Sequence, residues 1–155
     1  MAEVRSGVRI GVDVGRARVG VARCDRDALL ATPVETLARD GALDGIAAIV
    51  VELDPLEVVV GLPLSLSGGD TPSTGDARAF AAELAARITP PVRLVDERLS
   101  TVSAQRELHR SGRSTKSSRA VIDQVAAVII LQNALDLERA SGRAPGALVD
   151  PDEGS

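Results

Sequence analysis

The chain has 155 residues, of which 45% are hydrophobic, enough for one domain with a substantial buried core. Its net charge of −4 argues against indiscriminate binding of polyanions. We expect a soluble, cytoplasmic protein with no membrane partner, because no apolar run is long enough to span a membrane and the N-terminus lacks a signal-peptide pattern.

The first third of the chain predicts an antiparallel meander of three short strands, at residues 8–14, 17–24 and 29–38. Pro33 lacks an N–H group and should therefore lie at a sheet edge or a bulge. Helical spacing of apolar residues follows at 41–53 and stops at Pro55. Residues 56–61 form a nearly continuous apolar run, which is typical of a strand buried on both faces.

The second half predicts mostly helices around one more strand. The predicted elements are a loop at 65–74, a helix at 75–88, a strand at 92–96, and helices at 101–111 and 117–141. Pro, Gly and acidic residues dominate from residue 142, so we expect a domain at 1–141 and a disordered tail at 142–155. The fold class is therefore α/β, with a five-stranded mixed sheet, three antiparallel strands followed by two parallel ones, flanked by helices.

Three carboxylates stand where a charge is unfavourable. Asp13 lies in a predicted strand, Glu97 follows a buried strand directly, and Asp123 interrupts an almost wholly apolar helix. Each has a structural explanation as well: Asp13 in an edge hairpin, and Asp123 paired with Arg98 or Arg119.

If these acids converge, the cluster would need a divalent cation, because carboxylates at about 4 Å repel by roughly 4 kcal/mol at an effective dielectric of 20. Oxygen ligands favour Mg²⁺ or Mn²⁺, and the single histidine, His109, leaves no basis for a zinc site or a Ser-His-Asp triad. A metal ion held by carboxylates beside phosphate-binding arginines suggests phosphodiester hydrolysis.

A basic strip lies between Ala104 and Arg119, where five basic residues accompany one acid. It is either a phosphate-binding surface, with Arg110, Arg113 and Lys116 as candidate contacts, or a solvated helix face. Phe80 is the only aromatic residue, so stacking on bases is not available and structured nucleic acid is the favoured partner.

Four ordered motifs over roughly residues 8–140 resemble the YqgF family, also called RuvX, of bacterial RNase H-like proteins. They are Gly11-Val12-Asp13-Val14-Gly15 with Arg18-Val19-Gly20-Val21-Ala22, Val60-Gly61-Leu62-Pro63-Leu64 with Gly68, Asp96-Glu97-Arg98-Leu99-Ser100-Thr101, and Asp123-Gln124-Val125-Ala126-Ala127 with Ile130-Leu131-Gln132.

The resemblance implies an RNase H-like fold in which Asp13, Glu97 and Asp123 form the catalytic, metal-binding site. It also implies that Arg18 and the 65–74 loop contact or cover the substrate. Arg98 is a further candidate substrate contact, and Asp96 either orients Arg98 or caps the next helix.

Two activities are implied, 5′-end processing of precursor 16S ribosomal RNA and resolution of Holliday junctions, and we favour the first. A resolvase would act as a homodimer, with two sites cutting symmetric strands. A non-catalytic ribosome- or nucleic-acid-binding module stays open. The glycine-flanked Asp13 is also similar to the phosphate loop of actin-like ATPases and sugar kinases, but 155 residues leave little room for their two lobes.

Overall fold

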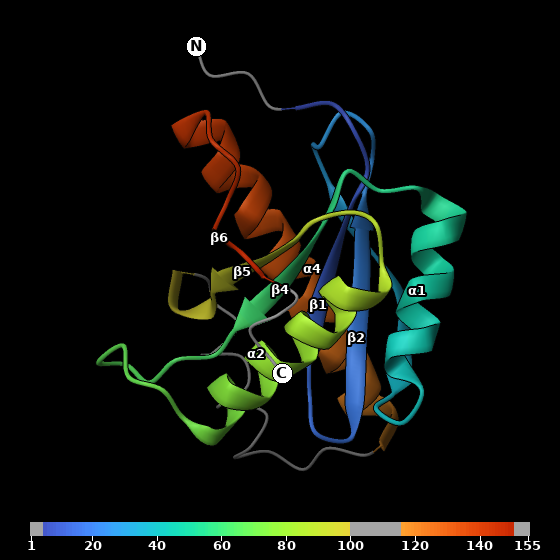
Figure 1. Cartoon of the computed structure of the whole chain (residues 1–155), viewed down its shortest axis with the longest axis vertical. Coiled ribbons are helices and arrows are strands. Elements are labelled where there is room, and N and C mark those ends of the chain that lie inside the picture. Colours follow the sequence, from blue (N-terminus) through green and yellow to red (C-terminus); the bar gives the residue numbers. More distant parts are fainter. Residues whose placement is uncertain (1–4, 100–115, 151–155) are drawn as a thin grey trace.

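The computed structural model describes residues 5–99 and 116–150, and the side chains of residues 5–98 and 124–150. One mixed sheet forms the centre of the molecule (Figure 1). Its strands lie in the order β3-β2-β1-β4-β5-β6. The predicted helix at 101–111 and the basic residues Arg110 and Arg113 lie outside the described residues.

The sheet combines an antiparallel meander with parallel strands, as predicted. The meander consists of β1 (Arg9–Val14), β2 (Arg18–Cys24) and β3 (Ala31–Ala38). Next to β1 lies β4 (Glu57–Leu62), followed by β5 (Val92–Asp96), and these three strands run parallel. Pro33 lies in the edge strand β3, beside the register shift at Val21/Ala22, so the prediction of an edge or a bulge is confirmed.

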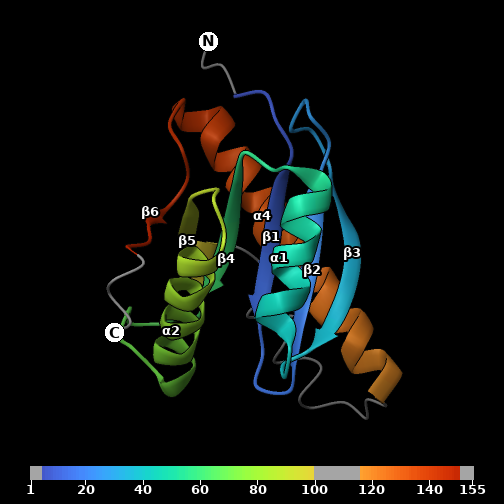
Figure 2. The same ribbon diagram turned by 45° about the vertical axis from the view of Figure 1, so that its right-hand side comes forward.

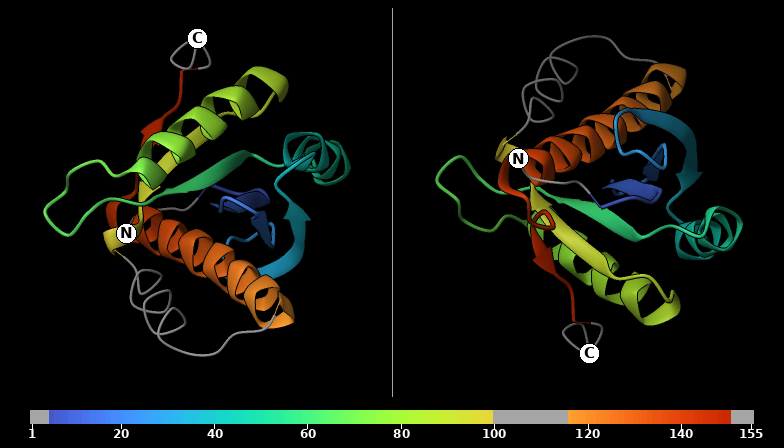
Figure 3. Two further views of the ribbon diagram at one scale, coloured as in Figure 1. Left: turned by 90° about the horizontal axis from the view of Figure 1, so that it is seen from below. Right: turned by 90° about the horizontal axis from the view of Figure 1, so that it is seen from above.

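Helices cover both faces of the sheet (Figures 2 and 3). Two helices, α1 (Ala42–Leu53) and α2 (Pro72–Arg87), pack on one face, and α4 (Lys116–Ser141) crosses the other. A single 3₁₀ turn, η1 (Glu97–Leu99), follows β5. Among the described residues, no helix has the length and apolar character that a membrane span requires.

Helix α2 begins at Pro72, three residues before the predicted start. The hydroxyl of Thr71 accepts a hydrogen bond from the N–H of Thr74, and the Thr74 side chain accepts one from the N–H of Thr71. This reciprocal capping box satisfies two N–H groups at the helix start, and Pro72 at the first position needs no partner for its nitrogen. The cap explains why residues of loop-like composition begin a helix.

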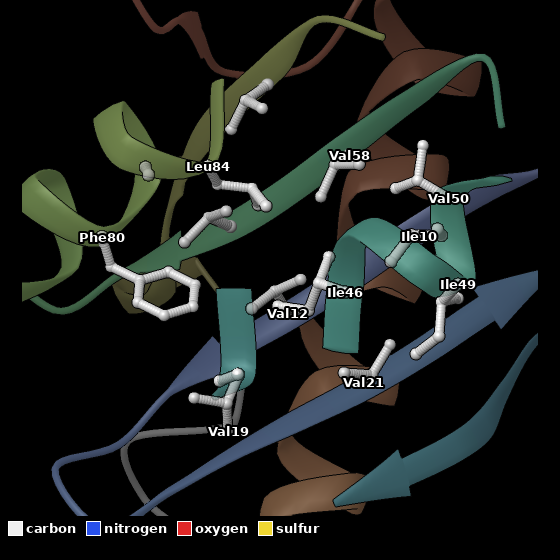
Figure 4. Close-up of a cluster of buried hydrophobic side chains, with 14 of the residues drawn as sticks. Ile10, Val12, Val19, Val21, Ile46, Ile49, Val50, Val58, Phe80 and Leu84 are labelled. Atoms are coloured by element: carbon white, nitrogen blue, oxygen red, sulfur yellow. The ribbon is translucent and has the colours of Figure 1, made fainter. Parts of the chain in front are cut away.

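The α1/α2 face carries the larger core (Figure 4). Alternate residues of the strands point into it, as period-2 patterning requires. Among them are Ile10, Val12, Val19, Val21 and Val58, which pack against Ile46, Ile49, Val50, Phe80 and Leu84 of the helices.

The α4 face is built from smaller residues, and helix and sheet therefore come close together. A Cβ placed on Gly11 would lie 2.6 Å from the Cβ of Leu131 and 3.0 Å from the carbonyl oxygen of Ala127. Only glycine permits this approach of α4 to β1. Ala22, Cys24 and Val59 continue the same close-packed surface.

A buried ion-pair network closes the α4 face at the amino ends of the parallel strands. Glu138 of α4 accepts hydrogen bonds from Arg9 at 2.9 Å and from Arg5 at 2.7 Å. Arg5 also donates to Glu57 at 2.7 Å, and Arg93 donates to the other oxygen of Glu57 at 2.8 Å. The side chains of Arg9, Glu57 and Glu138 are almost completely buried.

The sheet has six strands where five were predicted, because β6 (Ala147–Leu148) pairs antiparallel with β5. The N–H of Val149 donates to the carbonyl of Val92 at 2.8 Å, and the Val149 side chain is buried. Residues 147–149 thus pair with the sheet inside the stretch where a tail was predicted, and residues 151–155 lie outside the described residues. Their composition favours no local element, but the open edge of β5 supplies backbone partners that composition does not reveal.

Candidate active site

Asp13 lies on the face of β1 that α4 covers. Side chains two residues apart in a strand share a face, so Arg9, Gly11 and Asp13 all point toward this helix. Arg9 contacts Glu138, whereas Gly11 contacts Leu131 and Ala127, so α4 runs antiparallel to β1. Asp13, with 1% of its surface exposed, therefore lies beyond Ala127 toward the start of α4.

Glu97 reaches the same place from the end of β5. A Cβ built on Gly61 of β4 would lie only 2.7 Å from the Oε1 atom of Glu97, so the carboxylate occupies the space that this glycine leaves open. Val12 of β1 is paired with Val60 of β4, and Asp13 and Gly61 each come one residue later. Since neighbouring strands lie about 4.8 Å apart, Asp13 and Glu97 are close neighbours at the carboxyl ends of the parallel strands.

The environment of Glu97 disfavours its charged form. Burial is the main cause, and together with the negative charge of Asp96 it raises the pKa of Glu97 from 4.5 to about 7. A cation beside this carboxylate would oppose both effects, because it stabilises the ionised form. Perturbed carboxylates of this kind mark candidate functional sites.

Asp96 is hydrogen-bonded to Arg98, and its pKa shifts in the opposite direction from that of Glu97. It accepts hydrogen bonds from the backbone N–H of Arg98 at 2.9 Å and from the guanidinium at 2.7 and 3.1 Å. The Arg98 side chain lowers the pKa of Asp96 through these bonds. Asp96 thus holds the Arg98 side chain, which is one of the two roles expected for it.

The loop before α2 lies against Arg98. The Nη1 atom of Arg98 is 3.4 Å from the carbonyl oxygen of Leu66, and a Cβ on Gly68 would lie 3.1 Å from the same atom. Arg78 of α2 pairs with Asp70 at 2.7 Å and holds the other side of the loop. The predicted covering loop thus contacts Arg98, the residue after Glu97.

Arg18 also lies on the α4 face. It is two residues before Gly20, the cross-strand partner of Asp13, so it points to the same side of the sheet as Asp13. The β1–β2 turn carries a second, exposed arginine, Arg16, which sequence reasoning missed. The position of Arg16 in the turn directly after the strand of Asp13 could have pointed to it in the sequence.

The remaining predicted residues are only partly described. Asp123 belongs to α4, one turn before Ala127, and Lys116 is the first residue of this helix, but the side chains of both lie outside the described residues. Among the side chains of residues 5–98 and 124–150, no three acidic, histidine or cysteine groups are arranged to hold a metal ion. The structure thus brings together Asp13 and Glu97 of the predicted site.

A family model described as "RuvX: Holliday junction resolvase" matches residues 7–137 of the chain. The chain belongs to the RuvX family. The match covers β1 to most of α4, and therefore includes both described carboxylates and the position of Asp123. RuvX membership makes this chain a member of a nuclease family, as its motifs predicted.

Curated relatives of this RuvX chain match it over nearly their whole length. One from Clavibacter michiganensis subsp. michiganensis is 58% identical, covering 96% of this chain and 98% of the relative. Another, from Streptomyces coelicolor, is 56% identical over 95% of this chain and 90% of the relative. Both are named as candidate pre-16S rRNA nucleases.

Solved structures support the fold of the RuvX chain. Thermus thermophilus RuvC in complex with a Holliday junction substrate superimposes with a TM-score of 0.59 and 16% identity, covering 89% of this chain and 99% of RuvC. A second structure of Thermus thermophilus RuvC gives a TM-score of 0.52, also at 16% identity, over 86% of this chain and 97% of RuvC. The predicted RNase H-like α/β fold is confirmed.

Proposed function

We propose that this RuvX family member is a metal-dependent nuclease that hydrolyses phosphodiester bonds in structured nucleic acid. The observation that carries the proposal is the placement of two buried carboxylates, Asp13 and Glu97, at the carboxyl ends of neighbouring parallel strands, with Glu97 against Gly61. Burying two carboxylates side by side is costly unless a cation or a proton compensates them.

The packing of α4 supports Asp123 as the third member of the site. Arg9 lies opposite Glu138, and Gly11 lies opposite Leu131 and Ala127. The next residue of β1 on this face is Asp13, about 6.6 Å further along the strand. Four residues back along a helix is about 6 Å, which leads from Ala127 to position 123.

This donor set suits Mg²⁺ or Mn²⁺, because Asp13, Glu97 and Asp123 would offer only carboxylate oxygens. When bound, such a metal lowers the pKa of a water molecule and stabilises charge on the phosphate oxygens. Asp13 would hold it from β1, and Glu97 would hold it from the turn that directly follows β5. Arg18 and Arg98, with Arg110, Arg113 and Lys116 of the basic strip, would bind the phosphates on either side.

We favour 5′-end processing of pre-16S rRNA in the cytoplasm as the role of this protein. The support is the 56–58% identity to relatives of that name over 95–96% of the chain. Resolution of Holliday junctions by a homodimer is the second candidate, supported by the family description. A non-catalytic nucleic-acid-binding module is the third.

The test is cleavage of two labelled substrates, a precursor 16S 5′-end RNA and a mobile four-way DNA junction, with Mn²⁺ or Mg²⁺. We expect RNA cleavage that is lost in Asp13→Asn and in Glu97→Gln. Asp54→Asn is the matched control, because Asp54 is exposed at the end of α1 and its left-handed backbone accepts asparagine. Cleavage of the junction alone would favour the resolvase, and binding without cleavage of either substrate would favour the non-catalytic module.

A further inference from the structure

Arg39, directly after β3, connects three parts of the fold at the carboxyl end of the sheet. Its Nη1 atom donates to the carbonyl oxygen of Gly15 at 2.9 Å, in the turn that follows the strand of Asp13. Its two terminal nitrogens also donate to the two carboxylate oxygens of Asp76 in α2, each at 2.9 Å. The backbone N–H of Arg39 donates to the carbonyl of Ala17 at 2.9 Å, in the same turn.

The guanidinium of Arg39 is itself held in a fixed orientation. It lies over the ring of Phe80, the only aromatic residue of the chain, at 5.0 Å from the ring centroid. Phe80 is buried in the α1/α2 core (Figure 4). A planar guanidinium with one face on a ring and a two-point bond to a carboxylate has little freedom to turn, so the contact with Gly15 is directed.

The same end of α2 also holds the exit of β4. The hydroxyl of Thr74 donates to the carbonyl oxygen of Pro63, and the Thr74 side chain is fully buried. Through Thr74 and through Asp76 with Arg39, α2 thus fixes the segments that follow β4 and β1. These are the strands that carry Gly61 and Asp13.

We propose that Arg39 is a positioning residue of the active site, which holds the turn after Asp13 through the Gly15 carbonyl and thereby fixes the Asp13 carboxylate for metal binding. Arg39 touches no reacting atom and acts only through the backbone. This inference rests on the proposed function. Residues that hydrogen-bond a metal ligand directly typically change affinity or activity by 10–100-fold when they are replaced, and Arg39, which acts one step further away, should lie at the lower end of this range.

The test compares Arg39→Met with a matched variant, Arg87→Met. Arg87 pairs with Asp44 at 2.6 Å and also joins α2 to another element, but this bond links two helices and no backbone atom of the sheet. Methionine keeps most of the aliphatic stem in both variants and removes the charge and the donors. If Arg39→Met does not fold, Arg39→Lys takes its place in the test, because a single ammonium group cannot reproduce the planar, two-point hydrogen bonding of the guanidinium.

Two measurements are made on the folded variants. Hydrogen–deuterium exchange of the metal-free protein follows the amides of residues 14–18, and calorimetry gives the affinity for Mn²⁺. We expect at least several-fold faster exchange in this turn and about 10-fold weaker Mn²⁺ binding for Arg39→Met. We expect both quantities to stay within twofold of wild type for Arg87→Met.

Unchanged exchange at 14–18 in Arg39→Met would overturn the proposal, as would faster exchange with unchanged Mn²⁺ affinity. Equal losses of affinity in Arg39→Met and Arg87→Met would also overturn it, because a general loosening of α2 would then explain both. Failure of the proposed function is distinguishable: wild type would then bind no Mn²⁺ and cleave neither substrate, whatever the exchange at 14–18.

Discussion

The carboxylate of Glu97 lies against the backbone of Gly61, where a side chain as small as a methyl group would approach Oε1 to 2.7 Å. This contact joins the end of β5 to β4 and brings Glu97 beside Asp13, the neighbour of Gly61 on β1. The glycine is therefore part of the candidate site although it carries no functional group.

Gly61→Ala should impair cleavage by roughly 100-fold. The new Cβ would lie 2.7 Å from the Glu97 oxygen and 2.5 Å from the Cδ1 atom of Ile130, so Glu97 or α4 must move. We expect the free energy of unfolding to fall by about 1–3 kcal/mol, as for other overpacked cores. Cleavage kinetics and denaturant titration measure the two effects.

The control for this substitution is Gly75→Ala in α2. Nothing lies within 4 Å of a Cβ at Gly75, so the change should stabilise the helix by about 0.5–1 kcal/mol and leave cleavage unchanged. Wild-type cleavage by Gly61→Ala would show that the position of Glu97 against β4 is not needed for the reaction.

Mn²⁺ or Mg²⁺ should stabilise the folded protein against denaturant. A ligand that binds only the native state at 100 times its dissociation constant contributes about 2.7 kcal/mol. The effect should disappear in Asp13→Asn and persist in Asp54→Asn, because Asp54 lies at the far end of α1. An equal response of wild type and Asp13→Asn to the metal would remove Asp13 from the metal site.

Glu138→Gln should destabilise the protein by about 3–5 kcal/mol near neutral pH, because it leaves the buried Arg9 guanidinium without its charged partner. Burial raises the pKa of Glu138, but the bonds from Arg5 and the charges of Arg9 and Arg5 outweigh it, so the net shift is downward from 4.5.

The pH dependence follows from the direction of this shift. A carboxyl with a lowered folded-state pKa contributes stability above its unfolded pKa, and this contribution is lost as the pH falls through the folded value. The difference between wild type and Glu138→Gln should therefore be largest above pH 4.5 and shrink at lower pH. Chemical denaturation at several pH values measures it, and a constant difference would contradict the ion-pair explanation.

Ending the chain after residue 145 should destabilise the sheet, because β6 and the buried Val149 would be lost. Full burial of a valine side chain contributes about 1.5–3 kcal/mol. Hydrogen exchange should also become faster in β5, whose Val92 carbonyl accepts the Val149 N–H. A truncated chain as stable as wild type would restore the expectation that residues from 142 onward do not contribute to the fold.

Much of the architecture is predictable from local patterns. Alternating apolar residues specify the strands of the meander, and the buried run before Gly61 specifies β4. Asp13 and Glu97 stand out because a charge is unfavourable within a strand and directly after a buried strand. Such patterns are local, since each depends on residues a few positions apart. The catalytic and metal-binding roles of Asp13, Glu97 and Asp123 stay predictions, as do the substrate contacts of Arg18, Arg98, Arg110, Arg113 and Lys116.

Other features depend on contacts between residues that are far apart in the sequence. The buried ion-pair network joins residues far apart in the sequence, and no spacing predicts it. Its members are Arg5, Arg9, Glu57, Arg93 and Glu138. Ala147–Leu148 become a strand only because β5 presents an unpaired edge.

The order and type of most elements can be predicted from the amino-acid sequence, because backbone geometry imposes a period of 2 on strands and 3.6 on helices. The acidic residues stand out because a charge is unfavourable in a strand or an apolar helix. Three contacts could be seen only in the folded molecule: Glu97 lies beside Gly61, Arg39 holds the turn after Asp13, and Ala147–Leu148 add a strand to the sheet. These contacts join residues remote in sequence, and their geometry exists only once strands and helices have packed.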